Sequence, residues 1–462
     1  MARGGGFRPP AQSVGTGVAD TSYQKLRDKI VQKDAVVGVI GMGYVGLPLS
    51  LGIAKGGLTA LGFDIDDTKV TRIHAGESYF HHIPGDHVQE ALATGRLSAT
   101  SDFSRLNEAD VLVICVPTPL RRGYEPDLTY VERSVAAIAE TLRPGQLVIL
   151  ESTTYPGTVA EVVQPALEAT GLVAGTDFFL AFSPEREDPG NKTHSTTSIP
   201  KVVGADDAEA RDLATLFYQS VFETVVPVSS TRTAEATKLS ENIFRSVNIA
   251  LVNELKTVFE PMGVDIWEVI DAASTKPFGF MPFYPGPGLG GHCIPIDPFY
   301  LSWKAREFNV RTRFIELSGE INSKMPQHVV DKLAQAVDAR LAKGLNGTRV
   351  LVLGAAYKKN VDDMRESSAL QIMELLIARG AVTDYYDPYV PELPLTRKHP
   401  ALSGKRSVAW SDDLAAGYDA VMIVTDHDAV DYHAVVRHAQ LVVDTRNACR
   451  RAGAVGDNLV LA

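Results

Sequence analysis

A glycine- and proline-rich segment of the chain contains one cysteine, Cys293, and one carboxylate four residues later, Asp297. The segment reads Tyr284-Pro-Gly-Pro-Gly-Leu-Gly-Gly-His-Cys-Ile-Pro-Ile-Asp297. A thiol in such a loop becomes a nucleophile when it loses its proton, which a nearby cation or backbone amide groups favour. The alternative is a small core cysteine, the commoner place of a lone thiol. Because Gly-Gly-His-Cys is a poor core strand, we interpret Cys293 as a reactive thiol.

A glycine-rich turn far upstream, Gly41-Met-Gly-Tyr-Val-Gly46, follows an apolar run at 36–40 and precedes a helical pattern. In such a turn, Gly41 permits the tight bend, Gly43 lets the backbone approach a pyrophosphate, and Gly46 allows close helix packing. Asp64 ends the next apolar run, at the distance where an acidic residue binds the ribose diol of NAD. The alternative is a core turn with a surface aspartate. An acidic residue at this position favours an NAD site over an NADP site.

Two polar residues, Lys238 and Asn242, lie four apart in a stretch from about 232 to 262 that contains no glycine or proline before Pro261. The stretch predicts a long helix, on which both side chains project from one face. The alternative is a solvated helix face. We expect the pair to point toward one site.

The elements that position these residues follow an α/β rhythm. Short apolar runs alternate with helical patterns, which indicates parallel sheets built from βα units. The runs lie at 36–40, 58–63, 111–116, 147–150 and 178–182, and again at 349–354, 382–387, 420–425 and 441–444. We predict an α/β fold with two Rossmann-like parallel-sheet domains joined by the long central helix. The two halves share no fixed repeat, so we regard them as analogous domains.

The chain has 462 residues, more than one core usually organises. We expect a lead-in segment that is disordered over about its first 20 residues, an NAD-binding domain, a central helical domain with the cysteine loop, and a second nucleotide-binding domain. Their expected bounds are 1–33, 34–225, 226–330 and 331–462.

Composition excludes several classes of function. The net charge is -11 and no long basic run is present, so we expect no nucleic-acid partner. The uncharged run 35–54 is interrupted by five glycines, which argues against a membrane span. The three cysteines, Cys115, Cys293 and Cys449, have neither disulfide nor zinc spacing. We expect a cytoplasmic protein without a metal, in which Cys115 and Cys449 have no catalytic role.

Taken together, the motifs resemble those of the nucleotide-sugar 6-dehydrogenases, the UDP-glucose and GDP-mannose dehydrogenase family. The resemblance covers roughly residues 35 to 450. Its motifs are the turn at 41–46, Val116-Pro-Thr-Pro119, the segment 151–158, Phe182-Ser-Pro-Glu-Arg186, Ala234-Glu-Ala-Thr-Lys238 with Asn242, the cysteine loop, the segment 357–367 and Tyr386-Asp-Pro388.

This resemblance implies oxidation of a sugar C6 alcohol to a carboxylate with two NAD molecules, through a thiohemiacetal and a thioester on Cys293. Lys238 and Asn242 would stabilise oxyanions, and Asp297 would assist water activation. Glu185 would be a general base acting through water, and Thr153 would lie near the reacting oxygen. A structural role in a turn or cap is the alternative for Glu185 and Thr153.

The resemblance also implies binding residues. We expect Tyr44, Val45 and Thr118 to help bind the cofactor, together with the glycines of the turn and Asp64. Lys358, Arg365, Gly290 and Tyr284 are the expected substrate contacts, with Arg365 bridging a phosphate or a subunit contact. His292 is expected to shape the loop or order a water more than to act as a base.

The identity of the sugar is the most specific expectation that the sequence supports. Ile296 stands where many UDP-glucose enzymes carry lysine, whereas the segments 183–192 and 283–301 look like those of UDP-N-acetylglucosamine 6-dehydrogenases of surface-polysaccharide pathways. UDP-N-acetylmannosamine and UDP-glucose remain alternatives. A β-hydroxyacid dehydrogenase or a noncatalytic sugar-nucleotide binding protein are alternatives of another class; the second α/β half argues against the former.

The central helix also suggests how the chain assembles. Apolar residues such as Ile249, Leu251 and Leu255 lie between polar ones, so one face of the helix is available to a second copy. We expect a homodimer or a higher homo-oligomer.

Overall fold

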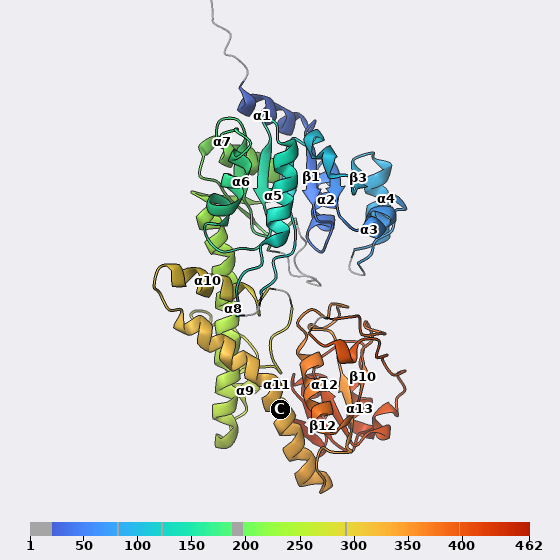
Figure 1. Ribbon diagram of the computed structural model, residues 1–462. Helices are drawn as coiled ribbons and strands as arrows, with labels where there is room; N and C mark the ends of the chain where they lie inside the picture. The colour runs from blue at the N-terminus through green and yellow to red at the C-terminus, as the bar shows by residue number, and fades with distance from the viewer. Residues whose placement is uncertain (1–20, 81–82, 122, 187–196, 292, 397) are drawn as a thin grey trace, which may run out of the picture.

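The computed structural model describes residues 21–80, 83–121, 123–186, 197–291, 293–396 and 398–462 (Figure 1). The tail 1–20 and His292, for which the sequence led to expectations, lie outside these residues. The chain forms an N-terminal α/β unit and a C-terminal α/β unit, with long helices between them. The predicted fold class, two Rossmann-like sheets and a long central helix, is confirmed.

The N-terminal sheet has eight strands in the order β3-β2-β1-β4-β5-β6-β7-β8. The apolar side chains of the inner strands are buried because helices cover both faces, whereas those of the edge strand β8 are partly exposed. The strands are β1 (Val36–Ile40), β2 (Thr59–Phe63), β3 (Leu97–Thr100), β4 (Val111–Ile114), β5 (Leu147–Leu150), β6 (Phe179–Phe182), β7 (Lys201–Gly204) and β8 (Val225–Val228). The helices are α1 (Ser22–Gln32), α2 (Gly46–Lys55), α3 (Asp67–His74), α4 (Gly85–Ala93), α5 (Thr129–Thr141), α6 (Gln164–Glu168) and α7 (Ala208–Gln219).

One pairing in this sheet departs from the parallel pattern. Strands β6 and β7 run antiparallel, with Phe182 opposite Gly204, whereas the other strand pairs in the described sheet are parallel. The Ser183 hydroxyl donates to the carbonyl of Val202 at 2.8 Å, which carries the contact past the end of β6. The start of β7 therefore lies beside the loop that follows β6.

Two helices of 29 residues each connect the two α/β units. Helix α8 (Thr231–Phe259) begins at Ser230, whose hydroxyl accepts a hydrogen bond from the backbone of Thr233, and it descends from the N-terminal unit (Figure 1). Helix α11 (Arg313–Leu341) crosses α8 and leads to the C-terminal unit. Buried amides join the two helices, since Asn253 donates to Asn322 at 2.9 Å. The shorter helices of this region are α9 (Ile266–Ser274) and α10 (Asp297–Glu307).

The C-terminal sheet has five parallel strands in the order β10-β9-β11-β12-β13. They are β9 (Arg349–Leu353), β10 (Val382–Tyr386), β11 (Ala420–Ile423), β12 (Val442–Asp444) and β13 (Leu459–Leu461), with helices α12 (Ser368–Ala378), α13 (Tyr432–His438) and α14 (Ala448–Arg451). The remaining helical turns of the chain are η1 (Phe103–Glu108), η2 (Val159–Val163), η3 (Glu260–Met262), η4 (Pro400–Leu402) and η5 (Leu414–Gly417). Ligands of open α/β sheets bind at the carboxyl ends of the strands. The motifs from the sequence follow β1, β4, β5, β6 and β9, at these ends.

None of the described helices is both long enough and apolar enough to cross a membrane.

Candidate active site

The glycine turn after β1 has the geometry that a dinucleotide needs. Gly41 has a φ of +93°, and a Cβ on it would lie 2.7 Å from the carbonyl oxygen of Cys115. A Cβ on Gly46 would lie 1.9 Å from the carbonyl oxygen of Gly41, so the helix can begin this close to the strand only with glycine there. A Cβ on Gly43 would meet no atom within 4 Å. The open space before Gly43, at the start of α2, fits the pyrophosphate of NAD.

Asp64 follows β2 and lies beside this turn. Its carboxylate accepts the backbone N–H of Met42 at 2.9 Å and pairs with Lys69 at 2.8 Å. These contacts hold the carboxylate where an NAD ribose would place its hydroxyl groups. The donor set at this turn therefore fits the predicted cofactor.

The other expected cofactor residues have mainly scaffolding contacts. Val45 is the N-cap residue of α2, and Tyr44 packs its ring against Phe80 with 4.2 Å between ring centroids. Thr118 is buried and donates to the carbonyl of Thr153 at 2.7 Å, while its own carbonyl accepts the hydroxyl of Tyr300. Thr118 thus links the loop after β4 to the loop after β5 and to α10.

Cys293 lies immediately before α10. Its carbonyl accepts the backbone N–H groups of Ile296 and Asp297 at 3.1 and 2.8 Å, so the cysteine and the helix start form one turn. Burial, helped by the negative charge of Asp297, raises the pKa of the Cys293 thiol to about 11. The positive charges of Lys238, Arg365 and Arg245 oppose this rise. The thiol therefore lies near three cations that would stabilise its thiolate.

The structure brings Lys238, Asn242 and Asp297 together. The exposed fractions of the three residues are 7%, 7% and 2%, so Lys238 and Asn242 do not occupy a solvated helix face. The Asn242 side-chain amide donates to the Asp297 carboxylate at 2.6 Å. Burial raises the pKa of Asp297 to about 7, although Lys238 and Asn242 favour its ionised form. A carboxyl group that titrates near neutral pH suits transfer of a proton to or from water.

A pH profile tests this interpretation of Asp297. If its ionised form activates water, kcat is expected to rise with pH through about 7, because the raised pKa keeps the group protonated below that pH. The variant Asp297→Asn is expected to lose this rise and to have a lower kcat at every pH. Steady-state rates of both proteins across the range check the expectation. A parent profile that is flat around pH 7 would assign Asp297 a structural role.

Glu185 and Thr153 lie at the same edge of the N-terminal sheet. Glu185 follows β6, where its carboxylate pairs with Lys201 at 3.0 Å and accepts the backbone N–H of Arg186 at 2.8 Å. The Arg186 side chain pairs with Glu241 of α8 at 2.7 Å, next to Asn242 in the sequence. Thr153 is half-buried in the loop after β5. The structure thus places both residues on loops at the edge of the sheet that α8 passes.

The expected substrate residues occupy two loops that contact each other. The backbone N–H of Gly291 donates to the carbonyl of Arg365 at 2.9 Å, and a Cβ on Gly290 would lie 2.6 Å from that of Tyr357. Lys358, which is half-buried, follows Tyr357 in the loop after β9. The cysteine loop and this loop of the C-terminal unit therefore pack as one surface.

Two of these residues have contacts that the sequence did not predict. The Arg365 guanidinium pairs with Asp363 at 2.6 Å and lies 4.1 Å from the centroid of the Tyr44 ring, so it joins the C-terminal unit to the glycine turn. Tyr284 donates its hydroxyl to Asp271 at 2.6 Å and stacks on Trp267. In this geometry Arg365 bridges the two α/β units, and Tyr284 connects the cysteine loop to α9.

Sequence reasoning missed Arg446, which follows β12. Its guanidinium donates to the carbonyl of Val424 at 2.9 Å, and a Cβ on Gly286 would lie 2.5 Å from it. Gly286 also donates its N–H to Asn253 of α8 at 3.0 Å. Arg446 thus adds a half-buried cation beside the cysteine loop. The local sequence signal that could have identified Arg446 is its place two residues after Asp444, which ends an apolar strand.

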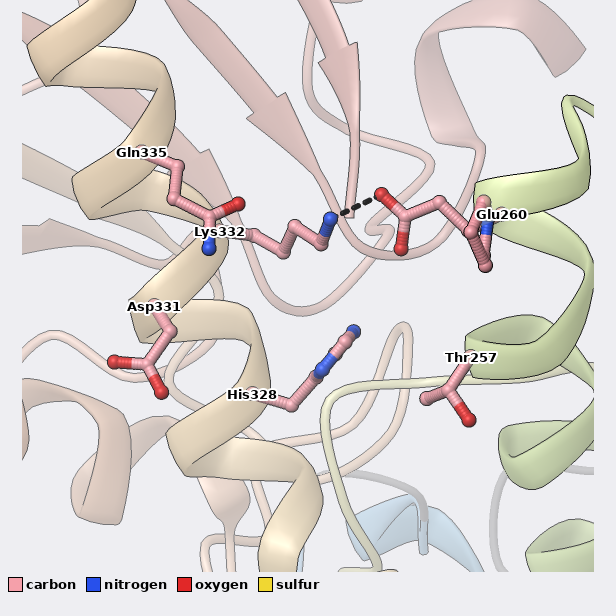
Figure 2. A pocket seen from close by; sticks show the side chains of 7 residues that line it. Thr257, Glu260, His328, Asp331, Lys332 and Gln335 are labelled. Atoms are coloured by element: carbon pink, nitrogen blue, oxygen red, sulfur yellow. Dashed lines mark hydrogen bonds and ion pairs between the residues drawn. The ribbon is translucent and has the colours of Figure 1, made fainter.

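A cavity of about 570 Å³ lies away from these groups, between the end of α8 and helix α11. Figure 2 shows His328 and Lys332 of α11 directed toward Thr257 and Glu260, with Lys332 and Glu260 joined as an ion pair. None of the predicted catalytic residues lines it. The predicted catalytic residues therefore lie elsewhere, on α8, at and just before the start of α10, and in the loops after β5 and β6.

Comparison with known families matches three segments that together make up most of the chain. Residues 35–222 match the NAD binding domain of the UDP-glucose/GDP-mannose dehydrogenase family. Residues 232–324 match the central domain of the same family, and residues 351–451 match its UDP binding domain.

Individual relatives carry two different substrate names. The chain is 37% identical to a UDP-N-acetyl-D-glucosamine 6-dehydrogenase of Pseudomonas aeruginosa over 78% of this chain and 84% of the relative. It is 34% identical to a UDP-N-acetyl-D-mannosamine dehydrogenase of Pyrococcus horikoshii over 89% of this chain and 95% of the relative. The solved structure of a UDP-D-ManNAc dehydrogenase from Pyrococcus horikoshii superimposes with a TM-score of 0.82 at 32% identity, covering 92% of this chain and 98% of that one.

Proposed function

Because the chain belongs to the UDP-glucose/GDP-mannose dehydrogenase family and is an NAD-dependent UDP-sugar dehydrogenase, we propose that it oxidises the C6 hydroxyl of UDP-N-acetylglucosamine to the carboxylate, supplying a precursor for surface polysaccharide. Oxidation of a UDP-N-acetylhexosamine at C6 agrees with both groups of relatives, those named for UDP-N-acetylglucosamine and those named for UDP-N-acetylmannosamine. The observation that carries the proposal is the group formed by the half-buried Cys293 and the buried Lys238, Asn242 and Asp297.

The first oxidation requires that the C6 hydroxyl lose a proton. Glu185, on the loop after β6, accepts it through a water molecule, and Lys238 stabilises the developing alkoxide. When held by the glycine turn and Asp64, NAD would supply the hydride acceptor for each of the two oxidations. Thr153 holds the reacting oxygen from the neighbouring loop.

The second oxidation requires that the aldehyde be held and converted. The Cys293 thiolate adds to the C6 carbon, so the aldehyde stays bound as a thiohemiacetal. Loss of a second hydride gives a thioester, and water then releases the carboxylate and the free thiol. Asp297 accepts a proton from that water, while Asn242 holds the Asp297 carboxylate at 2.6 Å. Lys238 stabilises the oxyanion of each addition step.

The amount of NADH formed per sugar tests this function. The three substrates are UDP-N-acetylglucosamine, UDP-N-acetylmannosamine and UDP-glucose, compared under identical conditions. We expect two NADH per sugar consumed and a preference for the first. Equal stoichiometry with a preference for UDP-N-acetylmannosamine would favour the second candidate, which the long alignment with the Pyrococcus horikoshii relative supports. One NADH per sugar would contradict the four-electron reaction.

We further propose that the enzyme is a homodimer built on α8. Phe244, Leu251 and Val258 are spaced by seven residues on this helix and are 50%, 50% and 41% exposed. Residues at this spacing lie on one face, and such an exposed apolar stripe is typical of an interface. Leu255, in contrast, packs against the cluster around Trp267 of α9.

The variant Leu251→Glu is expected to be monomeric, because a charge buried in the stripe would lack a partner. Light scattering after size exclusion gives the mass of each protein. Leu395→Glu is the matched control, since Leu395 is 85% exposed on the C-terminal unit and lies far from α8 in the sequence. A parent protein that is active and strictly monomeric would exclude the dimer.

A further inference from the structure

A buried lysine at the start of β7, Lys201, lies behind the catalytic edge of the N-terminal sheet. Its side chain is 2% exposed, and its ammonium lies 3.0 Å from Glu185 and 3.1 Å from Glu151. Both distances are those of charge-assisted hydrogen bonds. One cation is therefore shared by two carboxylates inside the protein.

The antiparallel pairing of β6 and β7 explains this position. Phe182 lies opposite Gly204, so three residues further along the β6 strand direction Glu185 comes opposite Lys201. Side chains directly opposite one another in antiparallel strands approach within contact distance. A parallel strand in this position would begin at the other edge of the sheet, and its first residue could not reach Glu185.

The other side of the lysine is enclosed. Its ammonium lies 5.2 Å from the ring centroid of Tyr218 and 5.1 Å from that of Phe222. The Tyr218 hydroxyl donates to Glu151, and the Cys115 thiol lies 3.8 Å from the same carboxylate. Burial alone would lower the pKa of Lys201, but the two carboxylates outweigh it and raise the pKa above its ordinary value. The two carboxylates therefore favour the charged form of the lysine.

Of the groups around Lys201, Glu185 is the one that is partly exposed at the catalytic edge of the sheet. The Glu185 side chain is 17% exposed, whereas that of Glu151 is fully buried and Tyr218 is inaccessible. A chain of groups with a closed inner end cannot pass protons through the protein. It can only hold its outer member in place, and both oxygens of Glu185 already have donors, from Lys201 and from the backbone of Arg186.

We propose that Lys201 is a positioning residue for the oxidation: it fixes the ionised Glu185 carboxylate at the edge of the catalytic site, and Glu151 secures the ammonium from behind. This inference rests on the proposed role of Glu185 as the general base. Removing the fixed charge releases the carboxylate and favours its protonated form, because a nearby cation stabilises the anion.

The variant Lys201→Met tests the proposal. We expect kcat to fall by about 10- to 100-fold, as displacement of a catalytic group typically does, while KM for the sugar nucleotide and for NAD stays within about threefold of the parent. In the Asp297→Asn background, which lacks the rise near pH 7 that belongs to Asp297, the remaining acid limb of the kcat profile is expected to move to higher pH, because Glu185 then needs a higher pH to ionise. Lys201→Arg, which keeps the charge, is expected to restore the position of that limb.

A second buried lysine provides the matched control. Lys304 of α10 is 6% exposed, pairs with Glu161 and Glu307 at 2.6 Å each, and lies 4.9 Å from the ring centroid of Tyr155. Lys304→Met removes the same charge from a similar setting without touching Glu185. We expect lower thermal stability with kcat and the pH profile of the parent.

Two further variants separate the possible outcomes. If Lys201→Met does not fold, Lys201→Met combined with Glu151→Gln removes the excess buried charge and is expected to fold with low kcat. If Glu185→Gln keeps the parent rate, the role of Glu185 itself is wrong. If Glu185→Gln is slow but the lysine variants keep the parent kcat and pH profile, Glu185 acts without Lys201 and the positioning role is overturned.

Discussion

Replacing Cys293 with serine is expected to lower the rate of carboxylate formation by at least about 1000-fold, as loss of a catalytic nucleophile commonly does. A serine hydroxyl is a far weaker nucleophile than a thiolate, so the aldehyde is no longer converted to a thioester. Binding of the UDP-sugar and NAD should persist, because the glycine turn and the loop after β9 are unchanged. Product analysis and NADH release in one turnover measure the two oxidations separately.

The variant Cys449→Ser is the control for this experiment. Cys449 of α14 is inaccessible and lies in the C-terminal unit, so Cys449→Ser should keep the parent turnover. Unchanged turnover in Cys293→Ser would exclude the covalent mechanism, whatever the substrate.

Replacing Lys238 with methionine is expected to lower kcat by about 100- to 1000-fold, the usual effect of removing one donor to an oxyanion. Lys238 is the buried cation that opposes the raised pKa of both Cys293 and Asp297. Its loss should therefore also move the rise of activity that begins near pH 7 to higher pH. Rates across pH with saturating substrate measure both effects.

Lys332→Met serves as the control for this substitution. Lys332 pairs with Glu260 at the cavity between α8 and α11, away from the cysteine loop. We expect it to keep the parent kcat. If Lys238→Met retained both kcat and pH profile, the oxyanions would be stabilised by other groups; Arg365 and Arg245 are two further cations whose charges act on the thiol.

Much of the fold could be predicted because most strands are short apolar runs. Strands such as β1, β5 and β12 are buried and rich in Val, Ile and Leu, and this composition is visible without a structure. Strands β3, β7, β8 and β13 were not predicted. β3 alternates with Ser98 and Thr100, β7 begins with a lysine, and β8 contains Pro227, so each lacks the continuous apolar pattern.

The residues of the candidate site also differ in whether the local sequence identifies them. Residues in local motifs, such as Cys293 with Asp297 and Lys238 with Asn242, were identified before any geometry was known, and the structure brings them together. Lys201 and Arg446 were not identified, because their neighbours lie far from them in the sequence. A lone lysine at the start of a strand carries no local signal, since its meaning comes from Glu151 and Glu185.

The antiparallel pairing of β6 with β7 also bears on how this protein can vary. Side chains alternate between the two faces of a strand, so one residue inserted between Lys201 and Gly204 would turn the lysine away from Glu185. A two-residue insertion would keep the face but displace the lysine by two positions along the strand. Descendants of this chain can therefore exchange the apolar residues of β7 more freely than they can change the number of residues between its two ends.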